Sequence, residues 1–66
     1  MSVKKAVNQA AEILGGKAAL AKAVGVSPPA ITQWVNGVRP VPPARAKSIE
    51  ALTGVSRKKL CPSFPW

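Results

Sequence analysis

The side chains with the clearest chemistry in this sequence are hydrogen-bonding groups gathered in residues 27–36, SPPAITQWVN. The amide of Gln33 can bond to both N6 and N7 of an adenine, and the hydroxyls of Ser27 and Thr32 can bond a base or a phosphate. The chain has no His, Asp or Tyr and a single cysteine, Cys61, so acid–base pairs, metal clusters and disulfides within one chain are almost excluded. We therefore expect a binding protein rather than an enzyme, with no cofactor, no metal and no small-molecule substrate.

The charge of the chain indicates a polyanionic partner. Ten Lys and Arg residues stand against two acidic residues, Glu12 and Glu50, and the formal net charge at pH 7 is +8. Nucleic acid is the simplest partner for such a domain, although an acidic membrane or an acidic protein would also be attracted. The hydrophobic content of 47% separates the chain from disordered polycations, and its 66 residues are enough for one small domain with a modest core.

Residues 17–36 have the spacing of two short helices joined by a tight turn, a helix-turn-helix unit. Ala21 supplies a small side chain where the helices cross, Gly25 permits the left-handed turn, and Val26 can drop into the angle between the helices. The shared apolar face consists of Leu20, Val24, Ile31, Trp34 and Val35. Because Trp34 has this buried spacing, we assign it to the core rather than to base stacking. The outer face of the second helix is left for DNA.

Further helices are expected to support this unit. Ser2 can cap a first helix that ends at Gly15. The third helix begins at Pro28 or one residue later, because a second proline follows it, and a fourth helix over 43–53 ends at Gly54. The inner stripe of the first helix is Val3, Val7, Ala10, Ala11, Ile13 and Leu14, and that of the fourth is Ala46, Ile49, Leu52 and Thr53.

Two features near the third helix bear on how the chain would meet DNA. Pro28 and Pro29 offer no backbone N–H, so contact with a thymine methyl is more plausible there than a hydrogen bond. Arg45 lies in the first turn of the fourth helix, where the helix dipole disfavours a cation. Its position is easier to understand if it faces a phosphate.

The tail over 61–66 differs from the rest of the chain. Pro62 and Pro65 keep it out of a helix or a central strand, and Ser56 can cap one last helical turn before it. Phe64 and Trp66 either fold back over the core or make a dimer contact. We therefore predict an all-α, compact helix-turn-helix domain of four to five short helices over 1–60, followed by a proline- and aromatic-rich tail over 61–66.

Membrane insertion is not expected. The longest uncharged stretch, 23–38, is too short and too polar to span a bilayer, and polar residues interrupt 6–14 where a signal peptide would need an apolar run. Glycines and prolines also divide the chain too often for one long amphipathic surface helix. We expect a cytoplasmic protein with a reduced cysteine.

The run ALAKAVGVSPPAITQWVNGVRPVPPARAKSIEALTG, residues 19–54, resembles the Cro-type repressors of lambdoid phages and prophages and the closely similar YdaS-like regulators. The resemblance extends over residues 3–60. Its most specific parts are A-x-x-x-G-V-S followed by I-x-Q-W, then N-G, R-x-x-P, a further R, I-E-x-x-T-G and R-x-x-L-C-P.

This resemblance implies a lambda-repressor-like fold and assigns contact positions. Base-facing positions of the recognition helix are Ser27, Pro28, Pro29, Thr32 and Gln33, and phosphate-contacting positions are Lys17, Lys22, Asn36, Arg39 and Arg45. The two prolines depart from the polar or small residues that relatives often carry there.

We therefore predict a sequence-specific DNA-binding transcriptional repressor that reads operator half-sites in the major groove, as a homodimer at least on DNA. The alternative is an antitoxin-like regulator or protein-interaction module whose C-terminal tail binds a partner protein. Exposure of Phe64 and Trp66 in the free protein distinguishes the two.

Overall fold

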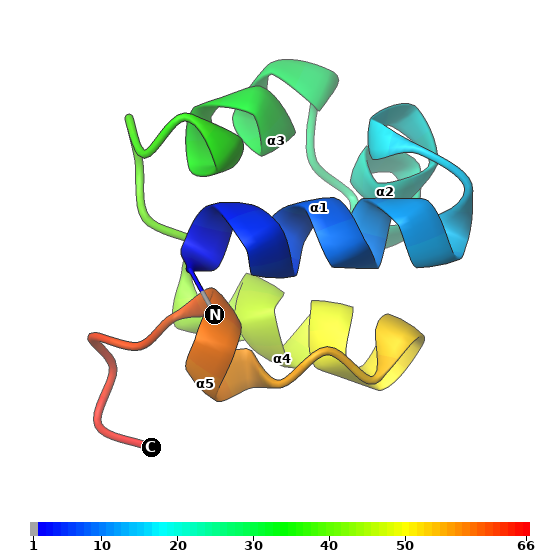
Figure 1. The fold of residues 1–66 in the computed structure, drawn as a ribbon. Helices are drawn as coiled ribbons and strands as arrows, with labels where there is room; N and C mark the ends of the chain where they lie inside the picture. The colour runs from blue at the N-terminus through cyan, green and yellow to red at the C-terminus, as the bar shows by residue number, and fades with distance from the viewer. Residues whose placement is uncertain (1) are drawn as a thin grey trace.

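Five helices make up the described part of the chain, residues 2–66, in this computed structural model (Figure 1). They are α1 (Val3–Leu14), α2 (Lys17–Val24), α3 (Pro28–Val35), α4 (Pro43–Thr53) and α5 (Arg57–Leu60). No strand occurs among these residues, so the prediction of an all-α fold with four to five short helices is confirmed. Met1, which the predicted domain 1–60 includes, lies outside the described residues. Within residues 2–66, no helix has the length and apolar character needed to cross a membrane.

Local capping explains where these helices begin and end. The backbone N–H of Lys5 donates to Ser2 Oγ at 3.2 Å, which satisfies a free donor at the start of α1. At the end of α2, Gly25 has a φ of 83° and the N–H of Val26 donates to the carbonyl of Ala21 at 2.9 Å. This is the left-handed glycine stop of a Schellman motif. The tight turn between α2 and α3 therefore follows from the glycine that the sequence supplies.

Helix α1 runs through the middle of the molecule, with α2 and α3 on one side and α4 and α5 on the other (Figure 1). Small side chains on α1 allow its neighbours to approach from both sides, and α1 contacts every other helix. The largest fully buried side chains are Val7, Leu20, Ile31, Val41, Ile49 and Leu60. Trp34 is only 5% exposed, so its assignment to the core is confirmed.

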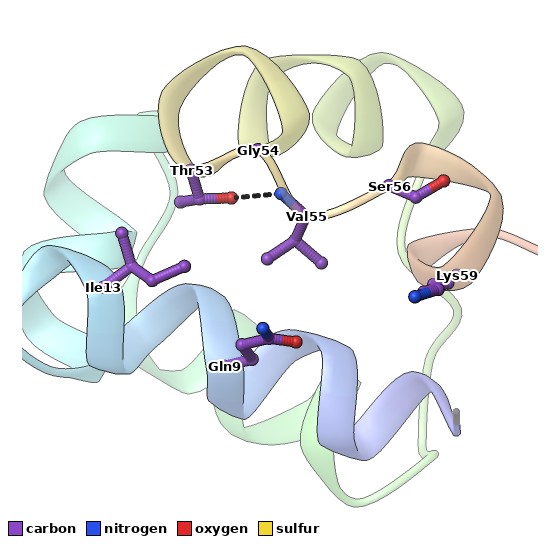
Figure 2. A pocket seen from close by; sticks show the side chains of 7 residues that line it. All are labelled: Gln9, Ile13, Thr53, Gly54, Val55, Ser56 and Lys59. Carbon is purple, nitrogen blue, oxygen red and sulfur yellow. Dashed lines mark hydrogen bonds between the residues drawn. The ribbon is translucent and has the colours of Figure 1, made fainter.

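Two predicted inner positions are wrong. Ile13 is 52% exposed and Leu52 is 46% exposed. Ile13 only lines a shallow hollow beneath the connection from α4 to α5 (Figure 2). In that connection the hydroxyl of Thr53 donates to the Ile49 carbonyl at 2.7 Å and accepts from the Val55 N–H at 3.1 Å. The chain thus turns inward just after the helix, and Val55, only 6% exposed, is buried although Leu52 is not.

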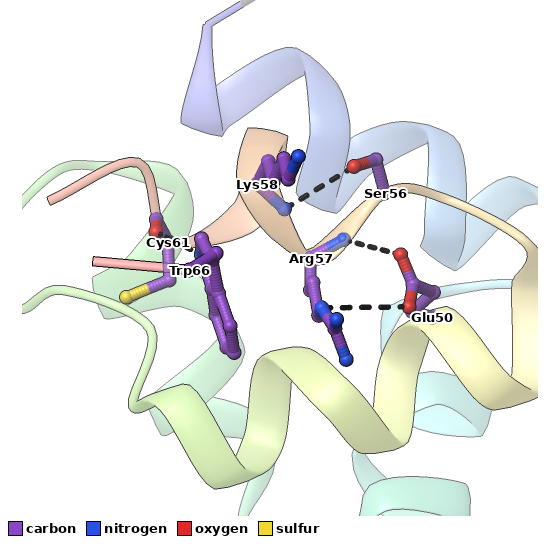
Figure 3. Close-up of polar contacts among 6 residues, drawn as sticks. All are labelled: Glu50, Ser56, Arg57, Lys58, Cys61 and Trp66. Carbon is purple, nitrogen blue, oxygen red and sulfur yellow. Dashed lines mark hydrogen bonds and ion pairs between the residues drawn. The ribbon is translucent and has the colours of Figure 1, made fainter. Parts of the chain in front are cut away.

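The tail folds back onto α4 and α5 through Trp66. Its indole Nε1 donates to the carbonyl of Cys61 at 2.8 Å, and the guanidinium carbon of Arg57 lies 5.0 Å from its ring centroid. Figure 3 shows the Arg57 and Trp66 side chains lying side by side, both directed toward α4. The backbone of Arg57 is fixed as well, because its N–H donates a 2.9 Å hydrogen bond to the carboxylate of Glu50. Phe64 lies against Trp66, with ring centroids 4.5 Å apart, but remains 41% exposed, so Trp66 packs on the core while Phe64 stays accessible.

Candidate nucleic-acid interface

Helix α3 lies at the surface, and its two faces differ sharply. The inner face buries Ile31, Trp34 and Val35. The outer face carries the residues predicted to meet bases: Ser27, Pro28, Pro29 and Thr32 are exposed and Gln33 is half-buried. The predicted base-contacting residues therefore share one accessible helix face.

The entry to α3 accommodates both prolines. Pro28 and Pro29 occupy the first two helical positions, where a backbone N–H has no partner within the helix. The helix begins at Pro28, the earlier of the two predicted starts. Ser27 is in the N-cap position but makes no side-chain capping bond, and its carbonyl accepts from the Ala30 N–H at 3.0 Å. Its hydroxyl thus remains available to a ligand.

Thr32 is partly engaged within its own helix. Its hydroxyl donates a long hydrogen bond of 3.5 Å to the carbonyl of Pro28, one turn earlier. A threonine bonded in this way keeps its oxygen lone pairs as acceptors. At this position α3 therefore presents a hydrogen-bond acceptor and a methyl group.

An open hollow beside α3 brings three of the predicted contact residues together. Gln33 forms part of one wall, and Arg39 and Arg45 approach from the connection to α4 and from α4 itself. The remaining lining is apolar and consists of Val26, Ala30, Trp34, Pro40 and Pro42. The hollow therefore combines two guanidinium-bearing residues with apolar ones, a combination whose chemistry suits an anion attached to a less polar group.

Arg45 also has a structural role that the sequence did not reveal. Its Nη1 donates to the carbonyl of Val24 at 2.9 Å, at the C-terminal end of α2. A cation is favourable at that end of a helix and satisfies one of its free carbonyls. The dipole of α2 thus offsets the unfavourable position of Arg45 at the start of α4, and a phosphate is not needed to explain it. A guanidinium has five N–H donors, so others remain for a ligand.

The other residues predicted to contact phosphates do not line this hollow and lie on separate parts of the surface. Lys17 and Lys22 are exposed on α2, and Lys17 lines a hollow that also contains Glu12. Asn36, at the end of α3, lines another hollow together with Arg39 and Lys4. The sequence did not predict that Lys4 would lie with these residues, because no spacing rule brings residue 4 beside residues 36–39. Only the packing of α1 against α3 does so.

A family model described as "Bacterial toxin YdaS" matches residues 7–66. The chain belongs to the YdaS family. Every residue predicted to contact DNA lies inside the matched segment, whereas Lys4 precedes it. The predicted resemblance to YdaS-like regulators is thereby confirmed, and the likeness to Cro-type repressors stays a prediction.

One YdaS relative comes from Escherichia coli (strain K12) and is described as "Putative transcriptional regulator YdaS". The two chains are 42% identical over 60 residues, which is 88% of this chain and 61% of the relative. This YdaS family member therefore spans less than two thirds of the relative's length. No solved structure matches this chain.

Proposed function

We propose that this YdaS family member is a sequence-specific DNA-binding transcriptional repressor of Cro-like mechanism, which reads an operator half-site by placing α3 in the major groove. The observation that supports this most directly is the exposed face of α3 beside a hollow that two arginines line. The description of the E. coli relative as a transcriptional regulator agrees with it.

In this mechanism, affinity and base reading come from different residues. Phosphate contacts by Lys17, Lys22, Asn36, Arg39 and Arg45 supply most of the affinity and fix the register on the duplex. Gln33 bonds the edge of an adenine, Ser27 and Thr32 bond neighbouring groups, and Pro28 with Pro29 contacts a thymine methyl.

A homodimer on DNA completes the proposal, because one recognition helix reads only a few base pairs. Two copies would occupy half-sites about one helical turn apart. Leu60 is 1% exposed and Trp66 packs against its own core, so the tail leaves mainly Phe64 for a second copy. Because Phe64 alone offers only a small apolar contact, we expect the dimer to be weak in solution and to form on DNA.

The description of the family as a toxin is compatible with the same chemistry. A repressor that occupies promoters of its host would slow growth without any catalytic step. If so, substitution of Gln33 or Arg39 should relieve any growth inhibition that expression of the chain causes.

A protein-interaction module is the second candidate, and the exposed Phe64 favours it. Against it stands Trp66, which a tail built to bind a partner would leave accessible but which here packs on α4 and α5. This candidate would be supported if the Phe64→Ala variant no longer bound a partner protein of the wild type but still bound DNA with unchanged affinity.

The deciding experiment is selection of bound sequences from a random duplex pool, followed by salt titrations on the selected sequence and on a scrambled control. A short inverted repeat bound far more tightly than the control supports the proposal. Uniform, strongly salt-dependent binding without an enriched motif would reduce the chain to a general DNA-coating domain.

A further inference from the structure

We propose that the DNA-backbone contact extends from the end of α3 onto the first helix, where Lys4 holds the phosphate next to the one that Arg39 holds. This inference rests on the proposed function and adds to it a contact residue from a helix outside the helix-turn-helix unit.

The geometry comes from an open hollow between the start of α1 and the end of α3. Lys4, Asn36 and Arg39 line it with polar groups, and the buried Trp34 and Val35 form part of its apolar lining. Lys4 and Arg39 are exposed, so both ammonium and guanidinium groups are accessible from solvent. The fold thus places a lysine from α1 beside two residues already expected to hold phosphates.

The positive charges of Lys4 and Arg39 in this hollow have no acidic counterpart there. No acidic side chain lines it, and the first turn of α1, which carries Lys4, contains no acidic residue. The partial positive charge at the start of a helix adds to that of the lysine. Elsewhere in residues 2–66 the acid Glu50 is paired with Arg57, which is the one ion pair of that part of the chain. The positive groups of this hollow therefore have no acidic partner among its lining residues, and an anion could supply the balancing charge.

Arg39 connects the hollow to the rest of the candidate interface. It lines both this hollow and the one that contains Gln33 and Arg45. Arg39 therefore shares one hollow with Arg45 and the other with Lys4, and both hollows adjoin α3. Cations in two hollows that share Arg39, beside a groove-reading helix, suit phosphates of one DNA strand, and Val38, which precedes Arg39 and is 68% exposed, offers an apolar contact to the sugar.

Lys5 provides a matched control, since it is also exposed in the first turn of α1 but does not line the hollow. Lys4→Ala and Lys5→Ala remove the same charge, and both relieve the same unfavourable interaction with the helix dipole. Salt titrations on the selected duplex should show a slope of log K against log salt that is shallower by about one for Lys4→Ala, and a smaller change for Lys5→Ala. Lys4→Arg should keep the wild-type slope.

Equal slopes for the two alanine variants would overturn the inference while leaving the proposed function intact. A loss of discrimination at one base pair without a change of slope would also overturn it, because it would place Lys4 on a base. If wild-type protein fails to bind duplex DNA at all, the proposed function falls with it. Circular dichroism checks that each variant is folded, and Lys4→Gln replaces Lys4→Ala if the alanine variant loses helix.

Discussion

The Nη1 of Arg45 donates a hydrogen bond to the carbonyl oxygen of Val24, and the two atoms are 2.9 Å apart. This bond joins the first turn of α4 to the last turn of α2, across 21 residues of sequence. Helix α3 and the loop that carries Arg39 lie between the two joined elements along the chain. The bond therefore helps to set how α3 and Arg39 are presented to a duplex.

The first prediction separates this structural role from a phosphate contact. Arg45→Ala should lower the free energy of unfolding by about 1–2 kcal/mol, the range for a part-exposed hydrogen bond with a charged donor. Arg39→Ala should leave it unchanged, because Arg39 is exposed. Both variants should make the salt dependence of DNA binding shallower by about one unit of slope. Urea denaturation and salt titration measure the two effects, and equal stability of the two variants would remove the structural role of Arg45.

The turn between α2 and α3 gives the second prediction. A Cβ added at Gly25 would meet only Arg45 Nη1, at 3.9 Å, so space is available. The obstacle is the φ of 83°, which costs an L-residue about 1–2 kcal/mol. Gly25→Ala should therefore destabilise the fold by about that amount. In a chemically synthesised chain, D-alanine at the same position should be tolerated, since its chirality favours positive φ. Equal loss of stability with both enantiomers would mean that space, not conformation, is limiting.

The third prediction concerns base reading by Gln33. Gln33→Ala should reduce discrimination at one base step by about 1–3 kcal/mol and leave binding to scrambled duplex nearly unchanged. Gln9→Ala serves as the control, because it removes an exposed amide from α1, outside the residues predicted to contact DNA. Competition binding with single-base variants of the selected sequence measures the effect. Equal weakening on every duplex would place Gln33 on the backbone instead.

The sequence predicted these helix ends well because their signals are local. Ser2 caps α1 and Gly25 ends α2 as expected, and Ser56 caps α5 by accepting from the Lys58 N–H at 3.2 Å. Each of these depends on residues within one helical turn. Such positions are readable from a single chain.

The features that sequence reasoning missed depend on contacts between distant segments. Helical spacing gave Leu52 an inner position, but Leu52 is exposed, and Val55 is buried after the chain leaves α4. The bond from Arg45 to Val24 and the place of Lys4 beside Arg39 both require the packed arrangement of several helices. Periodicity describes one helix at a time and contains no information about which neighbour covers its ends.

The last prediction tests how firmly the tail is attached. Trp66→Phe keeps an aromatic ring but removes the 2.8 Å hydrogen bond to the Cys61 carbonyl, so it should cost about 1 kcal/mol of stability. Trp66→Ala also removes the ring that packs on the core and lies 5.0 Å from the guanidinium carbon of Arg57, and should cost about 2 kcal/mol. Phe64→Ala removes a 41% exposed ring whose centroid lies 4.5 Å from that of Trp66, and should cost only about 0.5 kcal/mol, the least of the three. Thermal unfolding followed by circular dichroism ranks the three variants. If Phe64→Ala lowers the stability most, the tail packs through Phe64 rather than Trp66. Phe64 would then not be accessible to a protein partner, and the protein-interaction candidate would lose its support.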